Sequence, residues 1–205
     1  MNRLLLHPAA KPLLWLACLA PFGWLAWAAY SDQLGANPAE ALVRSSGDWT
    51  LRFLCLTLAV TPLRQWTGWH ALARFRRALG LATFGYACVH LLCYAWFDQG
   101  FDFAAVATDI AKRPFILVGF TAWLLLLPLA LTSFNRAIKA MGAKRWQALH
   151  RTVYAIALLA LLHFFWMRAG KNDFAEWGWY AALLGLLLGW RVWRVGRQVL
   201  HLRGA

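Results

Sequence analysis

The sequence predicts an all-α integral membrane protein, a bundle of six transmembrane helices with both termini in the cytoplasm. The 205 residues are 61% hydrophobic and only 14% charged, a composition typical of membrane proteins. The apolar residues form six runs separated by short polar loops, and the loops alternate between acidic and basic. Spans of about 20 residues fill such a chain without leaving room for a soluble domain. We therefore expect a single transmembrane domain over residues 1–205.

The first span is predicted at residues 13–30 and the second at 49–63. A signal peptide is the competing interpretation of the first run, because Ala26, Trp27 and Ala28 resemble a cleavage site behind an apolar stretch. The run is long for a signal peptide and contains three tryptophans, so we favour a retained helix. The third, fourth and sixth spans are predicted at 79–97, 114–134 and 177–193. The fifth is an apolar helix with His150 and His163 that follows a basic entry within residues 144–167.

The charged residues set the expected orientation of these spans. All eight acidic residues fall in the three loops assigned to the outside, and 15 of the 21 Lys and Arg residues fall in the segments assigned to the cytoplasm. Cytoplasmic loops of membrane proteins carry this excess of basic residues. The net charge of +13 is thereby explained by topology, and we expect no nucleic-acid partner. The four cysteines lie in apolar runs without CxxC spacing, which indicates neither disulfides nor a zinc site.

Two intramembrane histidines at one depth are the main functional signal. His90 lies eight residues before Asp98, and His163 lies eight residues before Lys171. Because the third and fifth spans run in the same direction, both imidazoles are expected about 12 Å inside the outer boundary. Two neutral imidazoles on neighbouring helices can supply both axial ligands of a haem iron. The alternative is that each ring only bonds a helix carbonyl or a neighbouring side chain.

His150 is harder to interpret. It precedes His163 by thirteen residues, which places the two rings about 140° apart around a straight helix. A bulge or a strong tilt would be needed for both to face one cavity. His150 is compatible with ligating a second haem, contacting a haem propionate or helping to hold a flavin. Thirteen residues before His90 the chain has Arg77, so a second bis-histidine haem would lack its partner.

Basic residues cluster at the cytoplasmic ends of the histidine-bearing spans. Two interpretations stay open for them: they only set the topology, or they also capture the anionic groups of a haem, a flavin or an acidic donor protein. We include Arg77 and Arg151 among the expected cofactor-binding residues. The cluster residues are Arg74, Arg76, Arg77, Lys144, Arg145 and Arg151.

Three stretches resemble the MsrQ (formerly YedZ) family, the haem-binding membrane subunits of a bacterial periplasmic protein-methionine-sulfoxide reductase system. They are RRALGLATFGYACVHLLCY (76–94), KRPFILVGF (112–120) and LTSFNRAIKAMGAKRWQALHRTVYAIALLALLHFFW (131–166). The resemblance spans nearly the whole chain. The family belongs to the wider ferric-reductase-like transmembrane group, whose oxidases and ferric reductases have two histidines where the third span has one.

The resemblance implies a b-type haem held by His90 and His163, with His150 also needed for cofactor binding. It further implies location in the bacterial inner membrane and electron delivery to a periplasmic molybdopterin subunit that reduces methionine sulfoxide in damaged proteins. Members are associated with FMN and with electrons from the quinone pool or a cytosolic flavin reductase. The chain has no GxGxxG or P-loop motif of its own, so electrons must arrive from elsewhere.

Our leading hypothesis is therefore a six-helix membrane electron relay, an oxidoreductase subunit whose substrate is reduced on a partner chain. A ferric or quinone reductase is the alternative in the same class. A haem-free permease or assembly scaffold is the alternative in a different class. An absorption spectrum of the purified protein separates the two classes.

Overall fold

A computed structural model describes residues 2–170 and 172–203, and within them all regular structure is helical. Lys171, which served as a marker of depth in the sequence, lies outside the described residues. The elements are α1 (Asn2–Leu6), α2 (Ala10–Tyr30), α3 (Pro38–Thr67), the 3₁₀ turn η1 (His70–Phe75), α4 (Arg76–Cys93), the π-turn η2 (Tyr94–Asp98), α5 (Phe103–Lys112), α6 (Pro114–Leu131), α7 (Asn135–Met141), α8 (Ala143–His150), α9 (Val153–Ala169) and α10 (Ala175–Arg203).

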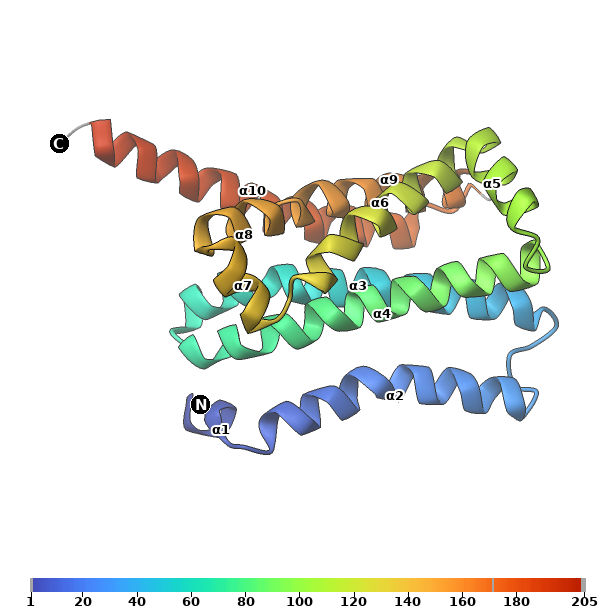
Figure 1. The fold of residues 1–205 in the computed structure, drawn as a ribbon, viewed down its shortest axis with the longest axis horizontal. Helices are drawn as coiled ribbons and strands as arrows, with labels where there is room; N and C mark the ends of the chain where they lie inside the picture. The colour runs from blue at the N-terminus through green and yellow to red at the C-terminus, as the bar shows by residue number, and fades with distance from the viewer. Residues whose placement is uncertain (1, 171, 204–205) are drawn as a thin grey trace.

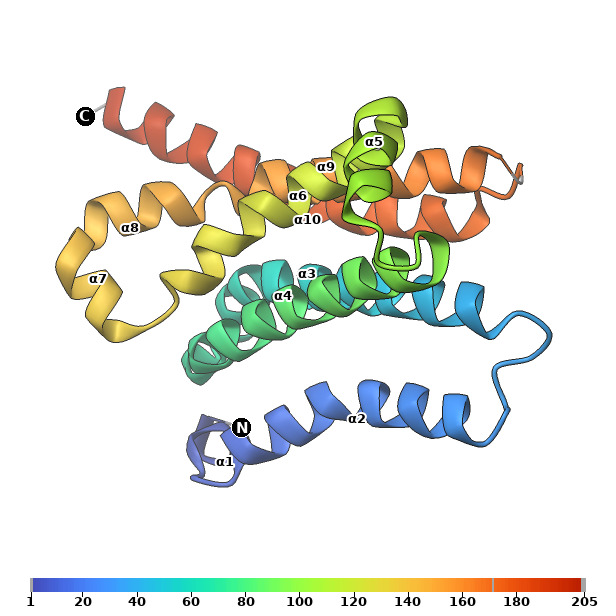
Figure 2. The same cartoon turned by 45° about the vertical axis from the view of Figure 1, so that its right-hand side comes forward.

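The long helices lie side by side in a bundle (Figures 1 and 2). Helix α2 runs along one side, α3 and α4 form the middle, and α6, α9 and α10 form the other side. Helix α5, the α2–α3 loop and the α9–α10 loop lie at one end, which we call the acidic end (Figure 1). Helices α1, α7 and α8 and the end of α10 lie at the opposite end, the basic end (Figure 1). The alternation of charged loops in the sequence thus corresponds to the two ends of one bundle.

Four helical segments are long and apolar enough to cross a membrane, among the residues that the structure describes. Helices α3 and α10 have the length but contain more charged residues, such as Arg52 in α3 and Glu176 in α10. The protein is therefore a multi-pass membrane protein. The four segments are Ala10–Tyr30, His70–Asp98, Pro114–Leu131 and Ala143–Ala169.

Helix α3 is twice as long as the span predicted at 49–63, because part of the predicted outer loop is helical. Asn37 caps the helix, its side-chain oxygen accepting a hydrogen bond from the Glu40 backbone N–H at 3.1 Å, and Pro38 follows at the first helical position. This pair is a strong helix start signal. The helix ends before Gly68, whose φ of 70° is accessible to glycine at little cost.

The predicted span at 144–167 is two helices rather than one. Helix α8 ends at His150 and α9 begins at Val153. At the junction the backbone tightens into i→i−3 hydrogen bonds, with Thr152 N–H donating to Leu149 O at 3.1 Å and Tyr154 N–H donating to Arg151 O at 3.1 Å. Such turns change the winding of the chain. The rotation calculated for a straight helix therefore does not apply to His150 and His163.

The interior of the bundle is built from faces of α3, α4, α6 and α9, with α10 packed against it. The buried residues recur at spacings of three and four, as expected for one face of a helix. Without water to exclude between helices, this close packing and not the hydrophobic effect holds transmembrane helices together. The most central buried residues are Leu51, Leu54 and Leu58 of α3, Ala87 of α4, Ala122, Leu126 and Leu129 of α6, Val153, Ile156 and Ala157 of α9, and Leu184 and Leu187 of α10.

This packing predicts a strong position dependence for the same substitution on α9. Ala157 has no exposed surface, whereas Ala155 two residues earlier is exposed. We expect Ala157→Leu to lower the stability by about 1–3 kcal/mol, because the added carbons must displace packed neighbours. Ala155→Leu should leave the thermal midpoint in detergent nearly unchanged. Equal midpoints for the two variants would contradict this packing.

Candidate functional site: a histidine pair in the bundle interior

The structure brings His90 of α4 and His163 of α9 together between the helices. Their ring centres lie 6.2 Å apart and their planes are inclined by 77°. Each ring is partly buried. The two histidines, 73 positions apart in the sequence, therefore meet at one level of the bundle, as their distances from the outer loops predicted.

Each imidazole is fixed by a backbone carbonyl of a neighbouring helix. His90 Nδ1 lies 2.9 Å from Val43 O of α3, and His163 Nδ1 lies 2.7 Å from Phe115 O of α6. A carbonyl oxygen can only accept, so each Nδ1 carries the hydrogen and each Nε2 has a free lone pair. Neither Nε2 forms a hydrogen bond within the described residues. Both rings thus present the atom that would bind a metal.

A glycine makes room for each ring. A Cβ atom on Gly47 would lie 3.1 Å from His90 Cε1, and one on Gly119 would lie 2.8 Å from His163 Nδ1. Each glycine follows the accepting carbonyl by four residues, Gly47 after Val43 and Gly119 after Phe115. Helix carbonyls point toward the residue four positions later, so the missing side chain opens the path to the carbonyl. Helices α3 and α6 thus share this arrangement of a glycine four residues after the accepting carbonyl.

The two imidazoles would supply two nitrogen ligands if a metal ion were bound between them. An imidazole nitrogen lies about 2 Å from a metal that it coordinates and roughly 1.2 Å from its ring centre, so two ligands on opposite sides of one metal would have ring centres roughly 6.4 Å apart. The observed 6.2 Å agrees. Metal-ligating histidines commonly donate the second ring N–H to a backbone carbonyl, as both rings do here. The described residues contain no group of three or more His, Cys, Asp or Glu side chains that could hold a bare metal ion.

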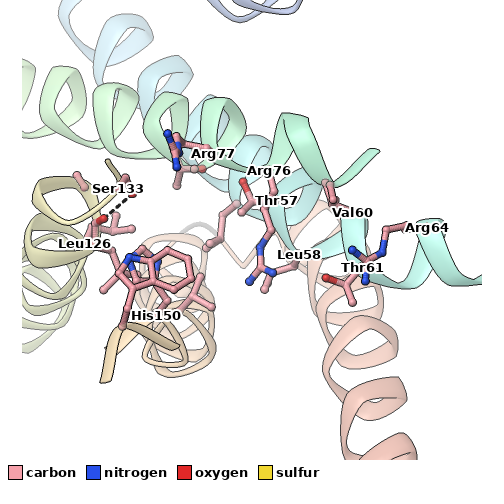
Figure 3. Close-up of a pocket in the computed structure, with 18 residues that line it drawn as sticks. Thr57, Leu58, Val60, Thr61, Arg64, Arg76, Arg77, Leu126, Ser133 and His150 are labelled. Carbon is pink, nitrogen blue, oxygen red and sulfur yellow. Dashed lines mark hydrogen bonds between the residues drawn. The ribbon is translucent and has the colours of Figure 1, made fainter. Parts of the chain in front are cut away.

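His150 lies elsewhere, in the wall of a cavity of about 370 Å³ at the basic end (Figure 3). Its ring stacks on Trp146 with centres 3.9 Å apart, and its Nε2 lies 3.1 Å from Thr132 Oγ1. The Thr132 hydroxyl donates its one hydrogen to Pro128 O at 2.6 Å, so it accepts from His150 Nε2–H. The free lone pair of His150 is therefore on Nδ1, unlike in the other two histidines.

The two arginines that we expected to bind a cofactor occupy different environments. Arg77 lines the cavity, and its Nη2 donates to Asn135 Oδ1 at 2.6 Å. Arg151 is exposed and is not among the lining residues. The structure thus brings His150 and Arg77 to one cavity and leaves Arg151 outside it.

Comparison with known proteins now adds to this geometry. Residues 46–161 match the model of the family described as ferric reductase like transmembrane component. The matched range includes His90 and His150 and ends two residues before His163. No solved structure matches the chain.

Curated relatives cover almost the whole chain. The protein-methionine-sulfoxide reductase heme-binding subunit MsrQ of Polaromonas naphthalenivorans is 71% identical over 92% of this chain and 86% of its own length. The proteins of the same name from Herminiimonas arsenicoxydans and Azospira oryzae are 53% and 55% identical, over 89% and 90% of this chain and 84% and 78% of their own lengths. The chain belongs to the MsrQ family.

Four features of the histidine site were not predicted from the sequence. They are the two carbonyls that fix the rings and the two glycines that admit them. Glycine is frequent in membrane helices, so Gly47 and Gly119 carry little signal alone. A search for glycines at the same depth as the histidines on the adjacent spans could have singled them out.

A polar cluster at the acidic end secures the helix that carries one of these carbonyls. Asp109 of α5 accepts hydrogen bonds from Tyr94 Oη at 2.7 Å and Gln99 Nε2 at 3.2 Å, and it pairs with Arg113 Nε at 2.8 Å. The cluster joins Tyr94, which follows α4, to Asp109 of α5. Its third partner, Arg113, precedes Phe115 by two residues. It therefore fixes the start of α6 relative to α4.

We expect Asp109→Asn to destabilise the protein by about 1–3 kcal/mol, because a partly buried acceptor is replaced by a group that cannot satisfy all three donors. The matched control is Asp32→Asn, at an exposed residue with a φ of 57° that asparagine also tolerates. Thermal unfolding in detergent measures both variants. An Asp109→Asn midpoint equal to that of the control would show that the cluster does not hold these helices.

Proposed function

We propose that the protein is a haem-binding electron-transfer subunit of a membrane reductase system, with one haem b between His90 and His163. The observation that carries the proposal is the pair of imidazoles 6.2 Å apart with both Nδ1 atoms engaged by carbonyls. Two neutral histidines that only needed hydrogen bonds would be satisfied without lying next to each other. A bis-histidine haem supplies a carrier that takes and gives one electron without binding substrate.

The chain's own residues contribute orientation and insulation to this site. The carbonyls of Val43 and Phe115 fix the tautomer and raise the basicity of the ligands, which tunes a metal centre. The surrounding helices are apolar, which lowers the local dielectric and excludes water. The residues present therefore fit a haem that would exchange electrons without binding a substrate.

The relatives' names supply the reductase system. Each is named a heme-binding subunit of protein-methionine-sulfoxide reductase. We propose that this protein passes electrons to a periplasmic molybdopterin-containing subunit that reduces methionine sulfoxide in oxidised envelope proteins. Quinol or a cytosolic flavin reductase is the proposed donor. The histidine pair lies nearer the acidic end, which shortens the last transfer if that end faces the periplasm.

We further propose that residues 1–205 form one ferric-reductase-like domain that crosses the bacterial inner membrane six times. In this arrangement α3 and α10 are the two additional crossings, and both termini are cytoplasmic. The basic end would then face the cytoplasm, in agreement with the positive-inside rule. The cavity beside His150 and Arg77 is our proposed place for a second cofactor, either haem or FMN.

Substituting either ligand tests the proposed function. We expect His90→Ala and His163→Ala each to lower haem affinity by more than about 100-fold. Loss of a residue that only hydrogen-bonds to a metal ligand can already cost roughly 100-fold, and these variants remove the ligand itself. The measurement is the Soret absorbance per mole of detergent-purified protein, with His70→Ala as the control because His70 is exposed in η1. Full haem retention in either ligand variant would refute the assignment. A wild-type protein without a Soret band after expression with ample haem would favour the scaffold class.

The glycines give a more selective test. In Gly119→Ala the new Cβ would lie 2.8 Å from His163 Nδ1, so the ring must move away from Phe115 O. We expect about a 10–100-fold loss of haem affinity and a shifted Soret maximum. Gly85→Ala is the matched control, because its Cβ would meet nothing within 4 Å. Identical spectra for the two variants would show that the contact at Gly119 does not position His163.

A further inference from the structure

The cavity at the basic end has a cationic wall. Its lining includes Arg64, Arg76 and Arg77 together with His150, and none of its lining residues is acidic among those that the structure describes. All eight carboxylate side chains of the chain lie on α3 before residue 49 or in the segments of the acidic end. No carboxylate side chain of the described residues therefore lies beside these arginines to neutralise them.

Several neighbouring arginines are occupied by the protein. Arg74 donates to Leu5 O, Arg77 to Asn135 Oδ1, and Arg191 to Leu187 O and Leu58 O. Arg64 and Arg76 differ, because neither makes a hydrogen bond or ion pair within the described residues. Arg64 Nε is moreover buried without a partner there.

Leaving these two guanidinium groups without an anion is unfavourable. Arg76 is exposed and is repelled by Arg64 and by Arg191. The buried Nε–H of Arg64 has no acceptor among the described residues, which is unfavourable for a buried donor. In Figure 3 Arg76 comes from α4 and Arg64 from α3, while His150 lies across the cavity from them. The arrangement is that of an anion site that the protein does not fill itself.

We propose that Arg64 and Arg76 bind the acidic group of an amphiphilic molecule whose apolar part occupies the rest of the cavity. Guanidinium groups bind carboxylates and phosphates through paired hydrogen bonds. Thr61 lines the cavity and supplies a hydroxyl group, whereas the Thr57 hydroxyl already donates its hydrogen to Phe53 O at 2.7 Å. The apolar part would contact the lining residues Leu54, Leu58, Leu126, Leu129 and Val153.

An acidic oxyanion on an apolar body has two main sources in a membrane. One is a haem, through its carboxylates, and the other is an anionic phospholipid, through its phosphate. Basic pockets between helices on the cytoplasmic side bind acidic lipid head groups. Only the haem source rests on the proposed function, and His90 and His163 are not part of this site.

The experiment measures haem, FMN and phospholipid per chain in the detergent-purified full-length protein. The test variant is Arg64→Gln/Arg76→Gln, and the matched control is Arg136→Gln/Lys139→Gln, which removes two exposed charges of α7. We expect one ligand to be depleted in the test variant alone. Titration with that ligand should show a roughly 30-fold loss of affinity, given the contribution of each cation near an anion. Arg64→Lys/Arg76→Lys keeps both charges and should restore much of the binding.

The outcome also names the source. If the test variant loses haem other than the one proposed between His90 and His163, the site binds haem carboxylates. If it loses phospholipid, the site binds a lipid phosphate. Depletion of FMN would overturn the amphiphile and favour FMN as the second cofactor of this cavity, because the FMN phosphate is carried on a polar ribityl chain. Unchanged content of all three, or equal depletion in the control, would overturn the anion site.

If the wild type holds no haem, the proposed function fails while the lipid measurement still decides this proposal. Gel filtration and the Lys variant separate misfolding from lost binding.

Discussion

The hydrogen bonds from two imidazoles to carbonyls of neighbouring helices are the constraint on which the site depends. In an apolar bundle a ring N–H needs an acceptor, and the accessible acceptors are backbone carbonyls that already belong to a helix. His90 reaches Val43 O and His163 reaches Phe115 O. These bonds join α4 to α3 and α9 to α6, and they leave the lone pair of each Nε2 free.

The same bonds explain why small residues occur where they do. A carbonyl one turn before a glycine is open to a ring from another helix, and both acceptors have this arrangement. Any larger residue at Gly119 would occupy the position of the His163 ring. The acidic-end cluster around Asp109 adds a second restraint on α6. Helix positions, hydrogen bonds and ring orientation thus form one connected system.

Charge is distributed along the bundle in a way that separates two functions. Every carboxylate side chain lies at the acidic end or in the adjoining parts of α3 and α10, nearer the histidine pair. The basic end holds the cavity with His150, Arg64 and Arg76. Arginine near a membrane surface serves topology first. At Arg64 the burial of Nε without a hydrogen-bond partner goes beyond what topology requires, because a topogenic arginine can remain in water, as the exposed Arg76 does.

The sequence by itself determined the helical membrane class, the alternation of charged ends and the common depth of His90 and His163, because apolar run lengths and residue counts are local properties of a chain with fixed rise per residue. It could not determine the break between α8 and α9, the place of His150, or the carbonyls and glycines of α3 and α6. Those depend on which helices are neighbours and how each is rotated. Only the tertiary structure decided them, since contacts between different helices, such as those of His90 with Val43 and of His150 with Thr132, leave no periodic mark in the sequence.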